Sequence, residues 1–207
     1  MPELVKHVIE LVPQMPQMPL MLQENFTVKL LDMLRTGELD CPIMAKPFPD
    51  TGLAVAPLYA EPFMVAVPSA HPLAKRGSIS SEEFKRETLL LGTGHCFRDH
   101  VLEVCPEFAR FASDAEGIRK RFEGSSLETI RYRVASGLGI TVVPQLSVRA
   151  FERSSGSDPV RYIPFTAPVP SRRVVLAWRR SFTRYEAIAA LRNAVYACLL
   201  DGVTRLS

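Results

Sequence analysis

The sequence predicts an α/β protein built from two lobes. Its 207 residues are enough to bury a sizeable core, and a content of 47% apolar and 23% charged residues is typical of a globular protein. Helical and strand-like apolar patterns alternate along the chain, about fifteen in all, which fits two α/β lobes better than a barrel of eight regular repeats. From this alternation we expect a parallel sheet in each lobe and a cleft between the lobes.

The first half of the chain opens with a helix. Apolar residues recur at helical spacing between Pro2 and Pro13, and prolines then end this helix. A second helix is expected at Thr27–Arg35, with Thr27 as a candidate cap and Gly37 as its stop. The segment Ser80–Glu83 has the residue types of a capped helix start. Strands are expected at Leu20–Leu22, Leu39–Ala45, Leu53–Leu58 and Phe63–Val67.

The second half continues the alternation. Helices are expected at Phe97–Val104, Leu127–Ala135, Pro144–Phe151 and Thr183–Leu200, the last with its apolar residues on one stripe. Strands are expected at Leu89–Leu91, Ile118–Phe122, Ile140–Val143, Val160–Ile163 and Arg173–Trp178. The segment Glu152–Pro159 is rich in Ser, Gly and Asp and is expected as a surface loop.

Composition excludes several classes of protein. Lys plus Arg exceed Asp plus Glu by 25 − 22 = 3, which is too small a surplus to indicate a nucleic-acid surface. No apolar run is long enough to span a bilayer, and the first residues do not have the pattern of a signal peptide. We therefore expect a cytoplasmic location. The four cysteines form no CxxC pair and no His/Cys cluster, so we expect no metal site, no cofactor and no permanent disulfide.

Cys96 has the sequence setting of a reactive thiol. It follows a strand and a Gly92-Thr93-Gly94 turn, and it stands at or just before a predicted helix start. Helix N-terminal amides and the neighbouring His95 and Arg98 favour the thiolate electrostatically. A thiolate is the form that peroxide oxidises to sulfenic acid, and a second thiol within reach converts that product to a disulfide.

Cys105 is the nearest second thiol along the chain. Nine residues of intact helix separate two Cα atoms by roughly 13 to 14 Å, whereas a disulfide needs them roughly 4.4 to 6.8 Å apart. If Phe97–Val104 is helical in the reduced protein, forming the bond requires that helix to unfold. Pro106 keeps the helix short. The pair would then act as a conformational switch.

A structural interpretation competes with this one. A cysteine in such a protein is usually a small buried apolar side chain, and Cys41 and Cys198 fit that description because they stand in apolar segments. For Cys96, spacing and setting alone leave both interpretations open.

Several segments of the chain resemble those of a known protein family. The segment Gly94–Asp99, with Cys105 following it, resembles the peroxide-sensing loop of LysR-type transcription regulators that respond to hydrogen peroxide. Segments 34–41, 71–74, 126–131 and 137–144 resemble LysR-type effector-binding domains, so the resemblance covers nearly the whole chain. It implies two Rossmann-like lobes of a periplasmic-binding-protein-like fold. Lobe I would comprise 1–60 and 174–207, and lobe II, with the redox cysteines, 61–173.

The resemblance also implies residue roles. Cys96 would be the peroxidatic cysteine and Cys105 the resolving cysteine. The peroxide pocket would contain Thr27, His95, Arg98, Asp99 and Arg173. Structural alternatives stand beside three of these: Thr27 and Asp99 are also suitable helix caps, and Arg173 is also suited to a solvated strand edge.

Partners follow from the same resemblance. We expect hydrogen peroxide as the signal, a homodimer or, in a full-length protein, a tetramer, and a cellular thiol reductant of the glutaredoxin or thioredoxin type. Promoter DNA and RNA polymerase would be contacted only by a full-length activator, because the family's amino-terminal winged helix-turn-helix is not in this sequence. We expect no membrane partner, and we do not expect the chain to be an enzyme.

Two rival functions remain. The chain could be an effector-binding module for a small organic ligand, with incidental cysteines, and thermal stabilisation by a ligand regardless of thiol state would indicate it. It could also be a thiol peroxidase, which steady consumption of peroxide with an external reductant would reveal.

Overall fold

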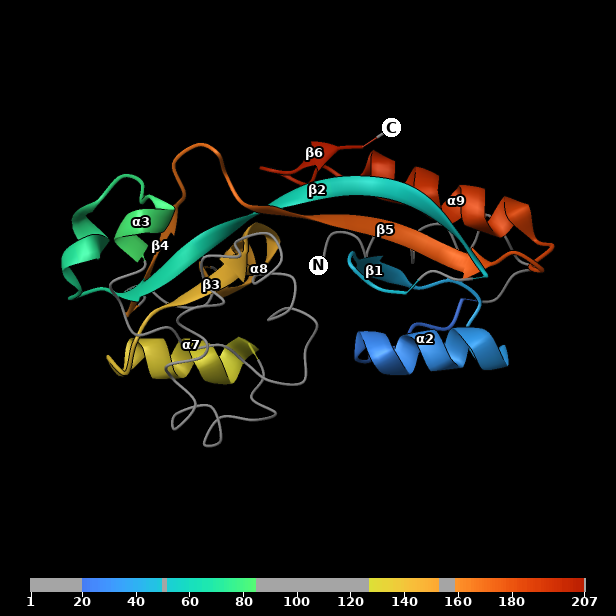
Figure 1. The fold of residues 1–207 in the computed structure, drawn as a ribbon, viewed down its shortest axis with the longest axis horizontal. Helices are drawn as coiled ribbons and strands as arrows, with labels where there is room; N and C mark the ends of the chain where they lie inside the picture. The colour runs from blue at the N-terminus through green and yellow to red at the C-terminus, as the bar shows by residue number, and fades with distance from the viewer. Residues whose placement is uncertain (1–19, 50–51, 85–126, 153–158, 207) are drawn as a thin grey trace. The chain divides into compact units, whose positions relative to one another are not determined.

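We describe a computed structural model of the chain, which covers residues 20–49, 52–84, 127–152 and 159–206. The chain divides into two compact units, Met1–Glu61 with Arg173–Ser207 and Pro62–Arg172. Strands β2 (Leu53–Pro68) and β5 (Ser171–Arg179) each contribute residues to both units. Figure 1 shows both strands as the long ribbons of the fold.

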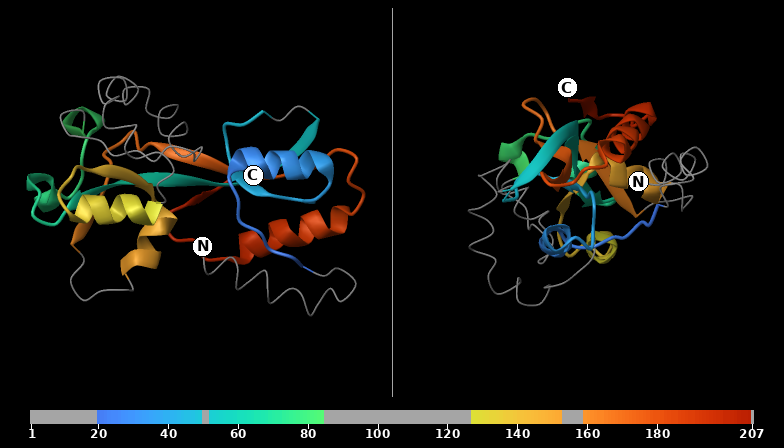
Figure 2. Two further views of the ribbon diagram at one scale, coloured as in Figure 1. Left: turned by 90° about the horizontal axis from the view of Figure 1, so that it is seen from below. Right: turned by 90° about the vertical axis from the view of Figure 1, so that its right-hand side faces the viewer.

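The first unit packs helices on both faces of a small sheet. Strand β1 (Ile43–Ala45) pairs with β5, and β6 (Thr204–Arg205) pairs with β2 at Tyr59 and Ala60. Helix α2 (Thr27–Thr36) covers one face, where Leu31 and Leu34 pack on residues of β1, β2 and β5. Helix α9 (Tyr185–Ala197) lies across the sheet from α2 (Figures 1 and 2). The sheet is therefore shielded on both sides.

The end of α2 is fixed by a glycine and an arginine. Gly37 adopts the left-handed conformation, with a φ of 86°, which a residue with a Cβ adopts only at a cost. The guanidinium of Arg179 donates to the carbonyl of Leu34 at 2.5 Å and to that of Leu39 at 3.1 Å. Because the last carbonyls of a helix lack partners within it, this arginine in β5 stabilises the end of α2.

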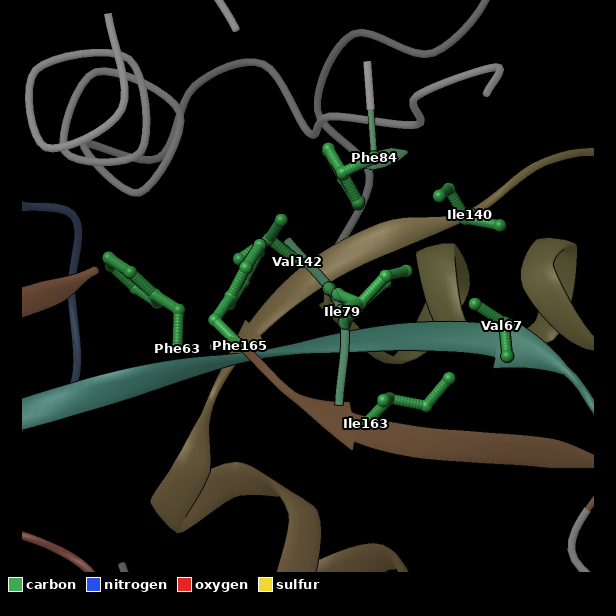
Figure 3. Packing of buried hydrophobic residues seen from close by; sticks show 9 residues of the cluster. Phe63, Val67, Ile79, Phe84, Ile140, Val142, Ile163 and Phe165 are labelled. Atoms are coloured by element: carbon green, nitrogen blue, oxygen red, sulfur yellow. The ribbon is translucent and has the colours of Figure 1, made fainter. Parts of the chain in front are cut away.

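The second unit is also a three-layer arrangement. In it β2 pairs with β3 (Thr141–Pro144) and with β4 (Val160–Pro164). Successive side chains of a strand point to opposite faces. Phe63, Val65 and Val67 accordingly face a cluster with Ile79, Phe84 and Phe165 (Figure 3). Ala66 faces the opposite cluster, built with α7 (Leu127–Ala135) and α8 (Gln145–Glu152).

Several expectations from the sequence hold with small shifts. Helix α7 has the expected bounds, α8 begins one residue later than expected, and α9 is shorter at both ends. The helix start at Ser80 is confirmed in α3 (Ser81–Phe84), which follows a 3-10 turn, η2 (Pro72–Lys75). The elements expected at Pro2–Pro13, Leu89–Leu91, Phe97–Val104 and Ile118–Phe122, and most of the loop at Glu152–Pro159, lie outside the described residues.

Among the described strands, the expectation of parallel pairing is wrong. Every strand pair whose register the structure describes is antiparallel, and parallel geometry appears in the isolated bridge between Ile79 and Phe165. The alternation of helices and strands identified the α/β class, but buried strands carry the same apolar pattern in either direction. The direction of pairing depends on contacts between residues that are distant in the sequence.

The bounds of β3, β4 and β5 differ from expectation by at most two residues at an end, and the other expected strands among the described residues differ more. Leu20–Leu22 forms neither helix nor strand, and the side chains of Met21 and Leu22 are exposed. Strand β1 begins at Ile43 rather than Leu39, because the N–H of Leu39 closes the end of α2 on the carbonyl of Met33 at 3.1 Å. The strands expected at Leu53–Leu58 and Phe63–Val67 are one strand, β2. Pro62, which has no N–H, lies between the residues of β2 that pair with β6 and those that pair with β3.

Candidate functional site

The residues at the centre of the predicted site lie outside the described residues. Cys96, Cys105, His95, Arg98 and Asp99 all belong to the segment 85–126. The structure describes the residues that precede and follow this segment, and it describes Thr27, Arg173 and two further cysteines. The residues on either side of the segment show how its two ends are held.

A reciprocal cap holds the chain just before the segment 85–126, which is called the cysteine segment below. The hydroxyl of Ser80 accepts from the N–H of Glu83 at 3.2 Å, and the N–H of Ser80 donates to the carboxylate of Glu83 at 3.0 Å. Arg76 forms an ion pair with the same carboxylate at 3.0 Å. This arrangement is a capping box, which satisfies two backbone donors at a helix start. It fixes α3 although the helix is only one turn long.

Phe84, the last described residue before the cysteine segment, is anchored by the burial of its side chain. Its side chain is 2% exposed, and its ring lies 5.9 Å from that of Phe165. Figure 3 shows Phe84 among the apolar side chains of its cluster, with Ile79 and Ile140 nearby. A buried aromatic side chain is costly to displace. The chain therefore enters the segment from a fixed point.

Helix α7 receives the chain after the cysteine segment. Ile130 and Val134 are buried against the sheet, and the Nε of Arg131 donates to the hydroxyl of Tyr162 in β4 at 2.9 Å. Phe84 and Ile130 belong to clusters on opposite faces of the same sheet. The segment with both predicted redox cysteines thus links the two outer layers of the second unit.

Thr27 is not the helix cap. It is the first residue of α2 and is half-buried, whereas the residue in the N-cap position is Phe26, which makes no side-chain capping bond. The backbone of Phe26 is extended, with a φ of −68° and a ψ of 149°, and Thr27 is already helical. The capping explanation for Thr27 is therefore wrong. Its role in a peroxide pocket stays a prediction.

Arg173 lies on β5 with an exposed side chain. Its carbonyl accepts from the N–H of Lys46 at 2.9 Å, so its backbone is part of the sheet edge formed with β1. Exposure agrees with the solvated-edge alternative for this residue. Its assignment to the peroxide pocket is a prediction from resemblance.

The two described cysteines are free thiols in settings that disfavour reaction. Burial, reinforced by the negative charge of Asp40, raises the pKa of Cys41 to about 12. Cys198 is buried, and its thiol donates to the carbonyl of Ala194 at 3.2 Å. Because the thiolate is the form that reacts with peroxide, Cys41 is a poor nucleophile near neutral pH.

The part of the chain that the structure describes contains no group of three or more His, Cys, Asp or Glu side chains suited to a metal ion. Among the described helices, none is long and apolar enough to cross a bilayer.

Comparison with known proteins identifies the family. The model of the LysR substrate binding domain matches residues 4–197. The chain is 34% identical over 193 residues to the hydrogen peroxide-inducible genes activator of Haemophilus influenzae, covering 91% of this chain and 61% of that protein. It is 35% identical to the DNA-binding transcriptional dual regulator OxyR of Escherichia coli K12, covering 91% of this chain and 60% of that protein. The chain thus spans about three-fifths of these relatives' length.

The fold agrees with that of a solved relative. The reduced form of OxyR from N. meningitidis superposes with a TM-score of 0.83 at 40% identity. The superposition covers 100% of this chain and 94% of that structure. The expected α/β fold of LysR-type effector-binding domains is therefore confirmed.

Proposed function

Since this chain belongs to the family of LysR substrate-binding domains, we propose that it is the regulatory domain of an OxyR-type transcription regulator that responds to hydrogen peroxide. The observation that carries the proposal is the pair Cys96 and Cys105 in a segment whose ends are anchored on both faces of one sheet. The names of the relatives support the same signal.

The proposed chemistry balances with peroxide as the only oxidant. The Cys96 thiolate attacks one peroxide oxygen, the O–O bond breaks, and the departing hydroxide takes a proton to become water. The Cys105 thiol then attacks the sulfenic sulfur, a disulfide forms, and a second water leaves. Two thiols and one peroxide give one disulfide and two waters. Arg98, His95 and Thr27 would polarise the bound peroxide, with Asp99 and Arg173 nearby.

The two described cysteines support a difference in reactivity with peroxide among the four thiols. The raised pKa of Cys41 and the burial of Cys198 disfavour both as first targets of peroxide. In contrast, Cys96 stands between basic residues at the start of a predicted helix. Selectivity would then follow from the electrostatics of each site.

The output would be a change in how domains pair. Forming the disulfide would rebuild the segment between α3 and α7, and this change would alter dimer or tetramer geometry in a full-length protein. Promoter DNA and RNA polymerase would be engaged by that full-length protein in the cytoplasm. A thiol reductant of the glutaredoxin or thioredoxin type would reset the switch.

Thiol labelling with peptide mass mapping tests the proposal, before and after stoichiometric peroxide. We expect a peroxide-dependent Cys96–Cys105 linkage in the wild type and a trapped sulfenic acid at Cys96 in Cys105→Ser. Cys41→Ser and Cys198→Ser serve as matched controls and should behave as the wild type. Four thiols that do not react with peroxide would contradict the proposal.

The family description also favours a second candidate, an effector-binding module for a small organic ligand. A ligand that stabilises wild type and Cys96→Ser equally, in a protein without peroxide-reactive thiols, would establish that candidate instead.

A further inference from the structure

A hollow of about 240 Å³ lies within the first unit, between the middle of β2, the end of α9 and the chain that follows α9. Its walls come from Leu58 and Tyr59 in β2, from Val195 in α9 and from Val203 and Arg205 near the carboxyl end. None of these residues was singled out by the sequence. They are far apart along the chain, and folding brings them together.

The inner wall is apolar and fixed. The side chains of Leu58, Tyr59 and Val195 are 0%, 2% and 3% exposed. The pairing of Tyr59 with Arg205 holds the outer wall against the inner one. The hydroxyl of Tyr196 lies 3.1 Å from the carbonyl oxygens of both Pro57 and Leu206, which ties α9 to both walls. The hollow is therefore formed before any ligand arrives, which reduces the entropy cost of binding.

The charged groups of the rim balance each other. Asp201 and Arg205 carry opposite formal charges, so their sum is zero. The guanidinium of Arg205 already lies 4.7 Å from the centre of the Tyr196 ring and donates to the Tyr196 carbonyl. A ligand with a net charge would meet one like charge, and the opposite charge would already be engaged, because Arg205 contacts Tyr196 and Asp201 makes an interaction of its own. The rim thus favours a neutral ligand.

The volume limits the size of the ligand. A closed, dry cavity of roughly 150 Å³ accommodates benzene. This hollow is partly open to solvent and lined by both polar and apolar groups, and its volume of about 240 Å³ leaves room for a benzene ring with a small polar substituent. The aromatic rings of Tyr59 and Tyr196 among the lining residues suit such a ring. We propose that this hollow is a binding site for a small neutral aromatic molecule with one hydrogen-bonding group. The site is independent of the thiol chemistry proposed above.

Benzyl alcohol is the probe for this proposal. Titrated into the reduced wild-type chain, it should raise the melting temperature with concentration. It should also shift backbone amide NMR signals, and the shifted signals should belong only to residues 58–60 and 194–206. The same result is expected after replacement of Cys96 by serine. Amide shifts centred elsewhere, or no shift up to the solubility limit of the probe, would overturn the proposal.

A pair of variants tests the position of the site. Val203→Trp places an indole in the hollow and should weaken benzyl alcohol binding by about tenfold or more. Val169→Trp makes the same change at an exposed residue of the second unit and should bind as the wild type does. If Val203→Trp does not fold, the amide map of the wild type decides alone. Equal binding by both folded variants would place the probe elsewhere and refute the site.

Charged analogues test the class of ligand. Benzoate and benzylamine have the same ring with a negative or a positive group. Both should bind more weakly than benzyl alcohol. Each would be repelled by the rim residue of like charge, and the rim residue of opposite charge is already engaged. Tighter binding of either one would refute the assignment to neutral ligands.

Discussion

Individual side chains set the reactivity expected of each cysteine. Cys41 follows Asp40 directly, and burial together with this negative charge disfavours its thiolate. Cys198 is buried at the end of α9, and its thiol donates a hydrogen bond to the Ala194 carbonyl. Both settings are the opposite of the one in which the sequence places Cys96, between His95 and Arg98. A peroxide response of this chain should accordingly be confined to one region.

The thiol of Cys41 gives a prediction about pH. Its pKa is raised in the folded chain to about 12, so the unfolded chain ionises first as pH rises above the ordinary value of 9.0. The stabilising effect of the protonated thiol is complete below pH 9.0 and is lost between pH 9.0 and about 12. Urea unfolding of wild type and Cys41→Ala should therefore show a steeper loss of stability in the wild type over this range. Equal slopes would mean that Cys41 is not desolvated in the folded chain.

Among the described elements, α3 is a short helix that depends on a side-chain cap. The helix has four residues, too few to be stable alone, and Ser80 and Glu83 satisfy each other's backbone donors. Ser80→Ala should lower the free energy of unfolding by about 1 kcal/mol. Ser78→Ala, at an exposed neighbouring position, should leave it nearly unchanged. Urea denaturation followed by circular dichroism measures both, and a similar effect of the two changes would argue against the cap.

Elements with local signals were predictable from the sequence, and elements defined by distant contacts were not. The capping residues at Ser80 and the apolar spacing of α7 are encoded within a few residues, and both predictions are confirmed. The start of β1 was misplaced because Leu39 closes α2 instead of pairing in a sheet. Thr27 was proposed as a cap because it has the right side chain, yet the helix begins one residue earlier than a Thr27 cap requires. Cap position depends on backbone geometry as well as residue type.

At the scale of the whole molecule, the α/β class and the family were accessible from the sequence, but the antiparallel pairing was not. β2 pairs with β3, β4 and β6, all of which lie far along the chain from it. The hollow at Tyr59 and Arg205 depends on the same kind of distant pairing. For the candidate site, the reactive chemistry expected of Cys96 and Cys105 could be predicted from the sequence. The anchors on either side of the cysteine segment, Phe84 and Ile130, became visible only in the packed clusters.

The structural effect of oxidation should be confined to the unit that contains the cysteine segment. The cysteine segment is joined directly to α3 and α7, which both belong to the unit Pro62–Arg172, whereas α2 and α9 belong to the other unit. If a Cys96–Cys105 disulfide rebuilds the segment, the contacts that hold its ends should weaken first. Hydrogen exchange of amides in Ile79–Phe84 and Leu127–Ala135 should become faster after peroxide treatment, with α2 and α9 nearly unchanged.

Cys105→Ser is the control for this experiment, since it keeps the Cys96 thiol and cannot form the disulfide. Its exchange rates in α3 and α7 should remain close to those of the reduced wild type after peroxide. Equally accelerated hydrogen exchange in the variant would mean that sulfenic acid formation alone causes the change. Acceleration centred on α2 or α9 would mean that oxidation acts through the first unit, and the proposed route from the cysteine segment into the fold would be wrong.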